Sequence, residues 1–164
     1  MSMLDELLFI KRFREQQAET LVFRSRADLA QARRAEDEAS ALLERFRVQA
    51  QADEQAWYQA LCERPVKLRE ITRVQEDVSM LRAAERAHEQ SLEQAGAQRA
   101  SAQQAYAEAS QRMRDASAVR EKFVELVRRE HLAASREHER REELEFEELS
   151  SVRRDREDWG SDDE

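Results

Sequence analysis

Proline and glycine are almost absent from this chain, and their absence limits how it can fold. Its 164 residues include a single proline, Pro65, and two glycines, Gly96 and Gly160. Turns, helix caps and bulges in globular folds depend on these two residue types, so this chain has few places to reverse direction. We therefore expect an all-α fold, an antiparallel two-helix coiled-coil hairpin that reverses near Pro65.

The position of Pro65, well before the midpoint, makes the two helices unequal in length. We expect one hairpin domain over residues 1–158, in which the second helix overhangs the first at the C-terminus as a single helix. At a rise of 1.5 Å per residue, the paired part is about 85 Å long. The expected segments are a first helix over about 3–61, a reversal over about 62–67, a second helix over about 68–157 and an acidic tail over 159–164.

Composition excludes several classes of protein. Charged residues make up 39% of the chain and aromatic residues 6%, which is typical of a coiled coil and too polar for a multi-layer core. A net charge of -8 without a basic patch predicts neither nucleic-acid binding nor attachment to a membrane surface. No apolar run approaches the roughly 20 residues of a membrane-spanning helix. Cys62 is the only cysteine, which favours a reducing, cytoplasmic environment.

The second helix carries a sustained heptad pattern. Alternating steps of three and four residues reach Ile71, Val74, Val78, Leu81, Glu85, His88, Leu92, Ala95, Arg99, Ala102, Tyr106, Ala109, Met113, Ala116, Arg120, Phe123 and Val127. Thirteen of these seventeen positions are apolar, which predicts a continuous seam along one face. The polar exceptions either fix the register or mark places where the seam is wet, and for Arg99 we favour the second interpretation.

The first helix carries a weaker pattern. The same spacing reaches Ala32, Ala35, Ala39, Leu42, Phe46, Gln49, Asp53, Ala56 and Ala60, and Leu4, Leu7, Ala18 and Leu21 nearer the N-terminus. Lys11, Arg14, Ser25 and Asp28 break it, which predicts a stutter or a shifted face. Pairing residues equidistant from Pro65 brings Gly96 near the alanines of the first helix. Gly96 then either allows a close approach of the helices or simply softens an exposed turn.

No catalytic or cofactor motif is present, so we do not expect an enzyme. The chain has no glycine-rich phosphate loop, no CxxC pair and no HExxH pattern. His131 and His138 are seven residues apart and can share a helix face, but a closed zinc site needs four ligands. We therefore expect no bound metal and no cofactor, and both histidines at the surface.

The densest apolar cluster lies at the expected reversal. Its members are Trp57, Tyr58, Leu61, Cys62, Val66 and Leu68. They either seal the end of the hairpin or present an aromatic anchor to a partner, because Trp and Tyr dominate interface energetics. Both hold if one aromatic side chain points inward and the other outward, so Trp57 and Tyr58 are candidate partner contacts.

A second apolar cluster lies at residues 120–130, read as REKFVELVRRE. Phe123 and Val127 continue the seam, but Leu126 widens the apolar face beyond it, and a wider face needs another neighbour. The N-terminal run from Leu7 to Ile10 is expected beside it. Mutual packing explains part of this apolar end of the hairpin, and a docking site explains the excess better.

This segment, with EHERREELEFEEL at residues 137–149, resembles the C-terminal half of the YscO proteins of bacterial type III secretion, which are related to the flagellar FliJ family. The likeness in sequence covers about 30 residues, whereas length and hairpin architecture agree along the chain. The resemblance implies a cytoplasmic stalk protein, peripheral to the inner-membrane export apparatus and involved in protein transport and virulence. Its implied partners are the hexameric export ATPase, which it would regulate, the export gate protein and secretion chaperones. By motif position, the contact residues are Phe123, Leu126, Val127, Arg128 and Arg129.

Two other functions compete with the stalk. A generic coiled-coil scaffold or tether would form a stable dimer, whereas we expect the stalk hairpin to be a monomer in dilute solution. A coil-type chaperone would need exposed apolar tips for unfolded clients, which the cluster around Trp57 can supply.

Overall fold

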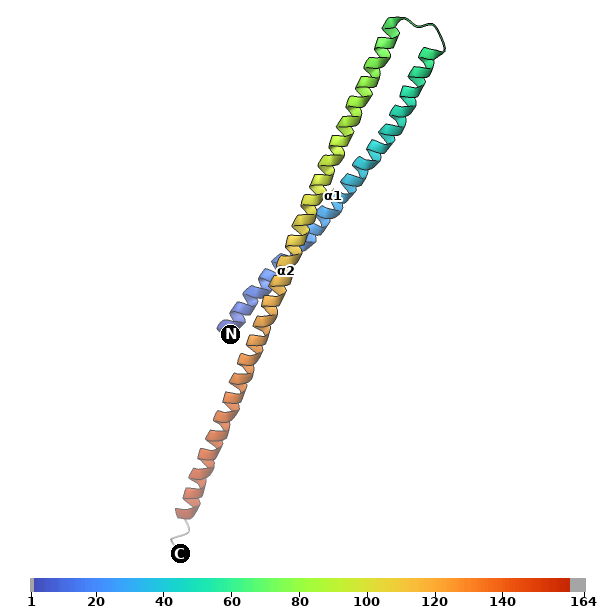
Figure 1. The fold of residues 1–164 in the computed structure, drawn as a ribbon. Coiled ribbons are helices and arrows are strands. Elements are labelled where there is room, and N and C mark those ends of the chain that lie inside the picture. Colours follow the sequence, from blue (N-terminus) through green and yellow to red (C-terminus); the bar gives the residue numbers. More distant parts are fainter. Residues whose placement is uncertain (1, 160–164) are drawn as a thin grey trace. The chain divides into compact units, whose positions relative to one another are not determined.

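The structure, a computed structural model, consists of two helices joined by a short turn. It describes residues 2–159, with side chains up to Arg156. Helix α1 spans Met3–Cys62 and helix α2 spans Leu68–Trp159 (Figure 1). The expected all-α antiparallel hairpin with a longer second helix is confirmed. Within this part of the chain, neither helix has a stretch long and apolar enough to cross a membrane.

The helix ends differ slightly from those expected. Helix α1 ends one residue later and α2 two residues later than expected, and Trp159 is the last helical residue described. Most of the expected acidic tail, from Gly160 onward, lies outside the described residues. Contacts between Cα atoms divide the chain into two compact units, so one hairpin domain over residues 1–158 stays a prediction.

The first unit, here called the hairpin unit, runs from Ala18 to Met113 and contains the turn. Pro65 disfavours a helical conformation at the residue before it, so α1 ends at Cys62. Lys67 then caps α2: its backbone N–H donates to Glu70 Oε2 at 3.2 Å, and Glu70 N–H donates to the Lys67 carbonyl at 3.0 Å. These bonds satisfy groups that the first turn of a helix leaves free.

Ion pairs between the helices show the register of the hairpin unit. Arg47 pairs with Glu85 at 3.0 Å, and Arg82 pairs with Glu54 at 3.2 Å. In each such pair, the residue numbers of the two partners add up to between 132 and 136. Pairing is therefore centred about two residues after Pro65, and not on it as the sequence analysis assumed.

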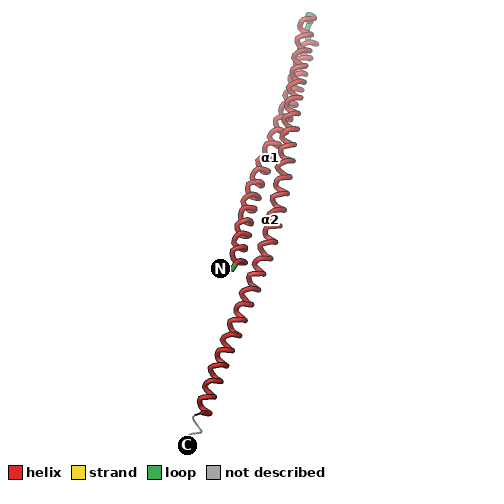
Figure 2. The backbone as a smooth tube through the Cα atoms, turned by 90° about the vertical axis from the view of Figure 1, so that its left-hand side faces the viewer, coloured by secondary structure: helices red, strands yellow, loops and turns green. Residues whose placement is uncertain are grey.

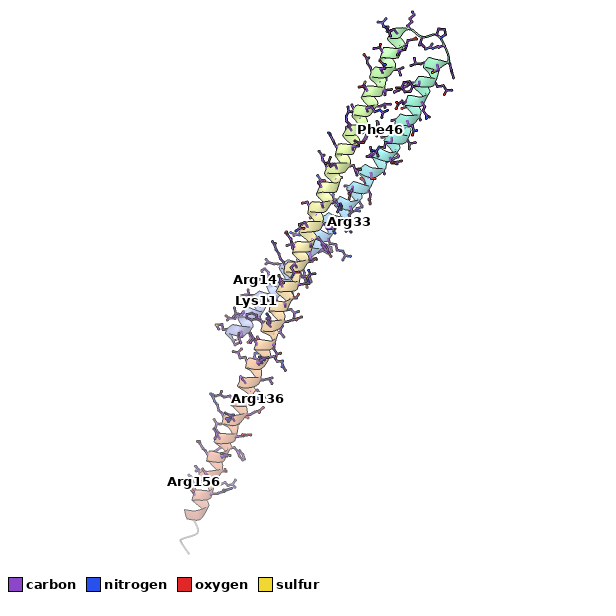
Figure 3. The ribbon with its side chains drawn as sticks, viewed as in Figure 1. Lys11, Arg14, Arg33, Phe46, Arg136 and Arg156 are labelled. Atoms are coloured by element: carbon purple, nitrogen blue, oxygen red, sulfur yellow. The ribbon has the colours of Figure 1, made fainter. Side chains whose placement is uncertain are left out.

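The seam of α2 agrees with the heptad pattern of the sequence. All seventeen predicted positions from Ile71 to Val127 are buried or half-buried, and Ala109 and Val127 are among the most buried apolar residues. All three polar exceptions in the hairpin unit have partners on α1, and that of Glu85 is Arg47. The ring of His88 lies 4.8 Å from that of Phe46, which is labelled in Figure 3. Arg99 Nε lies 2.8 Å from Glu36 Oε2 in an ion pair across the seam, and the two side chains are 35% and 30% exposed, so the wet position favoured for Arg99 stays a prediction.

The seam of α1 differs from the predicted one. Its buried and half-buried positions repeat without interruption at Leu4, Leu8, Lys11, Glu15, Ala18, Val22, Ser25, Leu29, Ala32, Glu36, Ala39, Leu43, Phe46, Ala50, Asp53 and Trp57. The expected seam residues Leu21, Ala35, Leu42, Gln49, Ala56 and Ala60 are exposed. Of the two alternatives, the shifted face is confirmed and the stutter is wrong, because Lys11 and Ser25 belong to the seam and every second seam position lies one residue later than predicted.

Gly96 is half-buried and faces a side chain of α1 in the hairpin unit. A Cβ atom added there would come within 3.3 Å of Glu36 Oε1. This atom is the end of a flexible side chain, so a close approach of the helices at Gly96 stays a prediction. The neighbour of Gly96 is the carboxylate that pairs with Arg99, not the alanines of the first helix.

A candidate partner-binding surface in the terminal unit

The second unit, here called the terminal unit, joins the N-terminal segment of α1, up to Gln17, to α2 from Arg114 onward. Ser2 and Asp5 form a capping box: Ser2 N–H donates to Asp5 Oδ2 at 3.0 Å, and Asp5 N–H donates to Ser2 Oγ at 3.2 Å. The bond from the Ser2 backbone is the main reason that the pKa of Asp5 is lowered. Ser2 Oγ also lies 2.7 Å from Glu130 Oε2, which ties the start of α1 to α2.

Charged side chains in the seam of this unit have partners on the opposite helix. Glu15 Oε2 lies 2.7 Å from Arg120 Nε, although the N–H is not directed for a hydrogen bond. Ser117 Oγ donates to Glu15 Oε1 at 2.7 Å. Nearer the N-terminus, the Lys11 ammonium lies 5.2 Å from the centre of the Phe123 ring, within the range of a cation–π contact. The polar exceptions of the two heptad patterns therefore match one another.

The structure separates the predicted contact residues of α2 into two groups. Val127 is buried and Phe123 is half-buried, so both contribute to the packing of the terminal unit itself. Leu126, Arg128 and Arg129 are exposed. Leu126, Arg128 and Arg129 are therefore accessible to a partner, whereas Phe123 and Val127 pack within the unit and position them.

Glu125 fixes the two exposed arginines. Arg128 Nε and Arg129 Nε each donate to a different oxygen of its carboxylate at 3.0 Å. These hydrogen bonds, that from Arg128 first, lower the pKa of Glu125 to about 2. The result is an exposed group of one carboxylate and two guanidinium groups beside Leu126, here called the arginine cluster.

We expect Glu125 to titrate far below an ordinary glutamate, because its ionised form holds two arginines. Its folded pKa is lowered, so the stabilisation is present above the unfolded value of 4.5 and is lost as pH falls towards about 2. The measurement is an NMR pH titration of the Glu125 side-chain carboxyl carbon. Replacing both Arg128 and Arg129 by alanine should return the pKa towards 4.5. A midpoint near 4.5 in the unchanged protein would contradict the arrangement.

The aromatic pair near the turn belongs to the hairpin unit. Trp57 is half-buried in the seam of α1, whereas the adjacent Tyr58 is exposed. One aromatic side chain thus points inward and the other outward. The contribution of either to partner binding stays a prediction.

Beyond Glu130, α2 continues as a single helix, here called the overhang (Figure 2). All its side chains from His131 to Arg156 are exposed. Each of the two histidines lies near one carboxylate. His131 Nε2 lies 3.5 Å from Asp5 Oδ2, and His138 Nε2 lies 3.5 Å from Glu142 Oε1.

Sequence reasoning missed an apolar stripe on α1 that faces away from α2. In the run predicted as one group, Leu8 is buried and Leu7 half-buried, but Phe9 and Ile10 are exposed. With two further exposed side chains they form a surface here called the outer face: Met3, Phe9, Ile10 and Phe13. The heptad that passes through Leu4, Leu8 and Lys11 would have revealed it, because these four residues lie on the opposite side of the helix from that seam.

The comparison with known families settles which group of proteins the chain is related to. Residues 4–152 match the family model described as Type III secretion protein YscO. The chain belongs to the YscO family. The crystal structure of the YscO protein from Vibrio parahaemolyticus superimposes with a TM-score of 0.82 at 25% sequence identity. The match covers 89% of this chain and 92% of that one. Comparison with curated proteins gives no match. Membership in the YscO family supports a role in type III secretion and partners within the secretion apparatus.

Proposed function

We propose that this YscO-family protein is a cytoplasmic stalk that engages the hexameric export ATPase and links it to the export gate. The observation that carries the proposal is the exposure of Leu126, Arg128 and Arg129 in the terminal unit. These side chains lie just before the overhang, where α2 continues as a single helix. Membership in the family supports it. Chaperones that have released their cargo are further proposed partners, and the stalk needs no catalytic site or cofactor of its own.

The mechanism follows from the symmetry of the proposed complex. One asymmetric coiled coil cannot make the same contacts with all six subunits of a ring. Its contacts therefore favour different states in different subunits, and shift their populations by the difference in affinity. Exposed charges such as Arg128 mainly set the association rate and the orientation, because rim charges contribute little to affinity. Leu126 supplies the apolar part of the contact.

The proposal is tested by purifying this protein together with the export ATPase of its own secretion system. We expect the two to co-purify and ATP turnover or ring assembly to change when the protein is added. Leu126→Ala combined with Arg128→Glu should weaken binding about tenfold or more, because it removes an apolar contact and reverses a charge.

The matched control is Val48→Ala, an exposed apolar residue on α1 in the hairpin unit. It should leave binding and turnover unchanged. Unchanged turnover and no co-purification with the unaltered protein would remove the proposed function. Equal loss with the control variant would remove the assignment to Leu126 and Arg128.

A further inference from the structure

Two exposed surfaces of the terminal unit carry apolar side chains that the hairpin does not cover. One is the outer face of α1, where Phe9 is 70% exposed. The other lies on the overhang, where Phe146 is 75% exposed. Its exposed apolar residues follow one another at steps of three: Phe146, Leu149 and Val152. Because glutamates flank them, this surface is here called the acidic ridge. Large apolar side chains grouped in this way mark an interaction site.

Basic side chains flank the outer face. At 100° per residue, Arg12 and Arg14 lie on opposite sides of the stripe formed by Phe9 and Phe13. Among the described residues, neither arginine makes an ion pair, and Arg14 is labelled in Figure 3. Glu6 carries the opposite sign at the amino-terminal end of the stripe. The outer face therefore suits an apolar helix with acidic flanks.

The acidic ridge has this chemistry. Glu143 and Glu147 lie one turn apart beside Phe146, and Glu145 lies on its other side. None of the three makes an ion pair with another residue that the structure describes. Like charges four residues apart weaken a single helix, so Glu143 and Glu147 gain from a nearby cation. The exposed Arg136 and Arg156 lie outside this acidic stretch (Figure 3).

We propose that two copies of the chain associate in an antiparallel manner, with the acidic ridge of each on the outer face of the other. The occupant of each surface is then the complementary surface of a second copy. Phe146 and Leu149 pack against Phe9 and Phe13, and the flanking glutamates meet Arg12 and Arg14. The contact is independent of the proposed role with the ATPase, since it needs this chain alone.

The geometry of the terminal unit allows both contacts to form at once. Partner numbers across this unit also add up to 132–136, so Phe9 is level with about residue 125 on α2. The acidic ridge begins about 20 residues further along the same helix, or roughly 30 Å. A twofold axis midway between the two surfaces brings each onto its counterpart. This is a closed, self-complementary interface.

The expected affinity is modest. Each contact involves a few side chains, so the two together fall at the small end of protein interfaces. A net charge of -8 on each copy opposes association. We expect a dissociation constant of about 10–100 µM, corresponding to roughly 5–7 kcal/mol. The chain is then mainly a monomer in dilute solution and a dimer when concentrated.

Sedimentation equilibrium of the full chain between about 5 and 500 µM tests the proposal. The average mass should rise from 19.3 kDa towards twice that value. Phe9→Ala with Phe13→Ala, or Phe146→Ala with Leu149→Ala, should each weaken association at least about tenfold. A constant mass of one chain over the whole range would overturn the proposal.

Two control variants match these changes in exposure. Phe23→Ala removes a phenylalanine that is 75% exposed but lies in the hairpin unit. Leu144→Ala removes an exposed leucine on the opposite side of the overhang from Phe146. Neither should change the dissociation constant by more than about twofold. If these two variants weaken association as much as the Phe9 and Phe146 variants do, the assignment of the contact to the outer face and the acidic ridge is wrong. Circular dichroism checks that every variant stays helical.

Exchange of charge separates this contact from docking of another protein. A chain with Arg12→Glu and Arg14→Glu should fail to self-associate, as should one with Glu143→Arg and Glu147→Arg. Mixing the two should restore a dimer, since each reversed surface then meets its complement. No restoration would overturn the pairing of these surfaces, and capture of the ATPase by the outer face without any self-association would reassign that face to a different partner.

Discussion

Replacing Leu43 by alanine is expected to lower the free energy of unfolding by about 2–4 kcal/mol. Leu43 is 4% exposed, and truncation removes a buried side chain and leaves a cavity between two helices that cannot close around it. The adjacent Leu42 is 48% exposed, so Leu42→Ala should cost less than about 1 kcal/mol. Urea unfolding followed by circular dichroism measures both.

The pair of variants distinguishes two registers of the first helix. The sequence pattern places Leu42 in the seam, whereas the structure places Leu43 there. A larger loss for Leu42→Ala than for Leu43→Ala would restore the sequence-based register and contradict the seam through Leu29 and Phe46.

Replacing Glu15 and Arg120 together by leucine is expected to raise the free energy of unfolding by about 1–2 kcal/mol. The side chains of Glu15 and Arg120 are 16% and 29% exposed, so both lose much of their hydration. For an ion pair in such a place, the electrostatic attraction offsets little more than the cost of removing both charges from water. Apolar replacements of similar size therefore commonly stabilise a protein. The unfolding temperature should therefore rise.

The single replacements should have the opposite effect. Arg120→Leu leaves the Glu15 carboxylate in the seam without its cation, at an expected cost of about 1–3 kcal/mol. Glu15→Leu leaves the Arg120 guanidinium in the same position. A double variant less stable than the unaltered protein would show that the pair itself stabilises the hairpin.

The sequence was sufficient to predict the course of α2. Its seam consists mostly of apolar residues in an uninterrupted pattern, so hydrophobic periodicity alone located all seventeen positions. The turn was equally predictable, because Pro65 allows few alternatives. Both features depend on information carried by neighbouring residues.

The seam of α1 could not be located in the same way. Its polar members, such as Glu15 and Glu36, are favourable only because α2 supplies Arg120 and Arg99 at the same levels. A search along one helix scores them as errors and prefers a stripe of exposed alanines. Matching the charged exceptions of the two helices across the turn would have found the register.

The candidate surface was predicted in part for the same reason. The motif REKFVELVRRE indicated the correct segment, but only the register shows that Val127 is buried and Leu126 exposed. The outer face escaped notice because Leu8 and Phe9 are neighbours in sequence, although Leu8 is buried and Phe9 is exposed. Their separation depends on the pairing of α1 with α2.

The matched charges of the seam prevent the two helices from sliding past one another. A slip of one heptad would leave hydrophobic contacts largely intact, since leucine and alanine are interchangeable partners in a repeating pattern. It would, however, place Glu15 opposite Met113 or Val127, and Glu36 opposite Leu92 or Tyr106. Each unit thus contains its own charge that rejects a slipped pairing. A force pulling along one helix must therefore break ion pairs before the helices can move, and the hairpin resists shear more than its alanine-rich composition suggests.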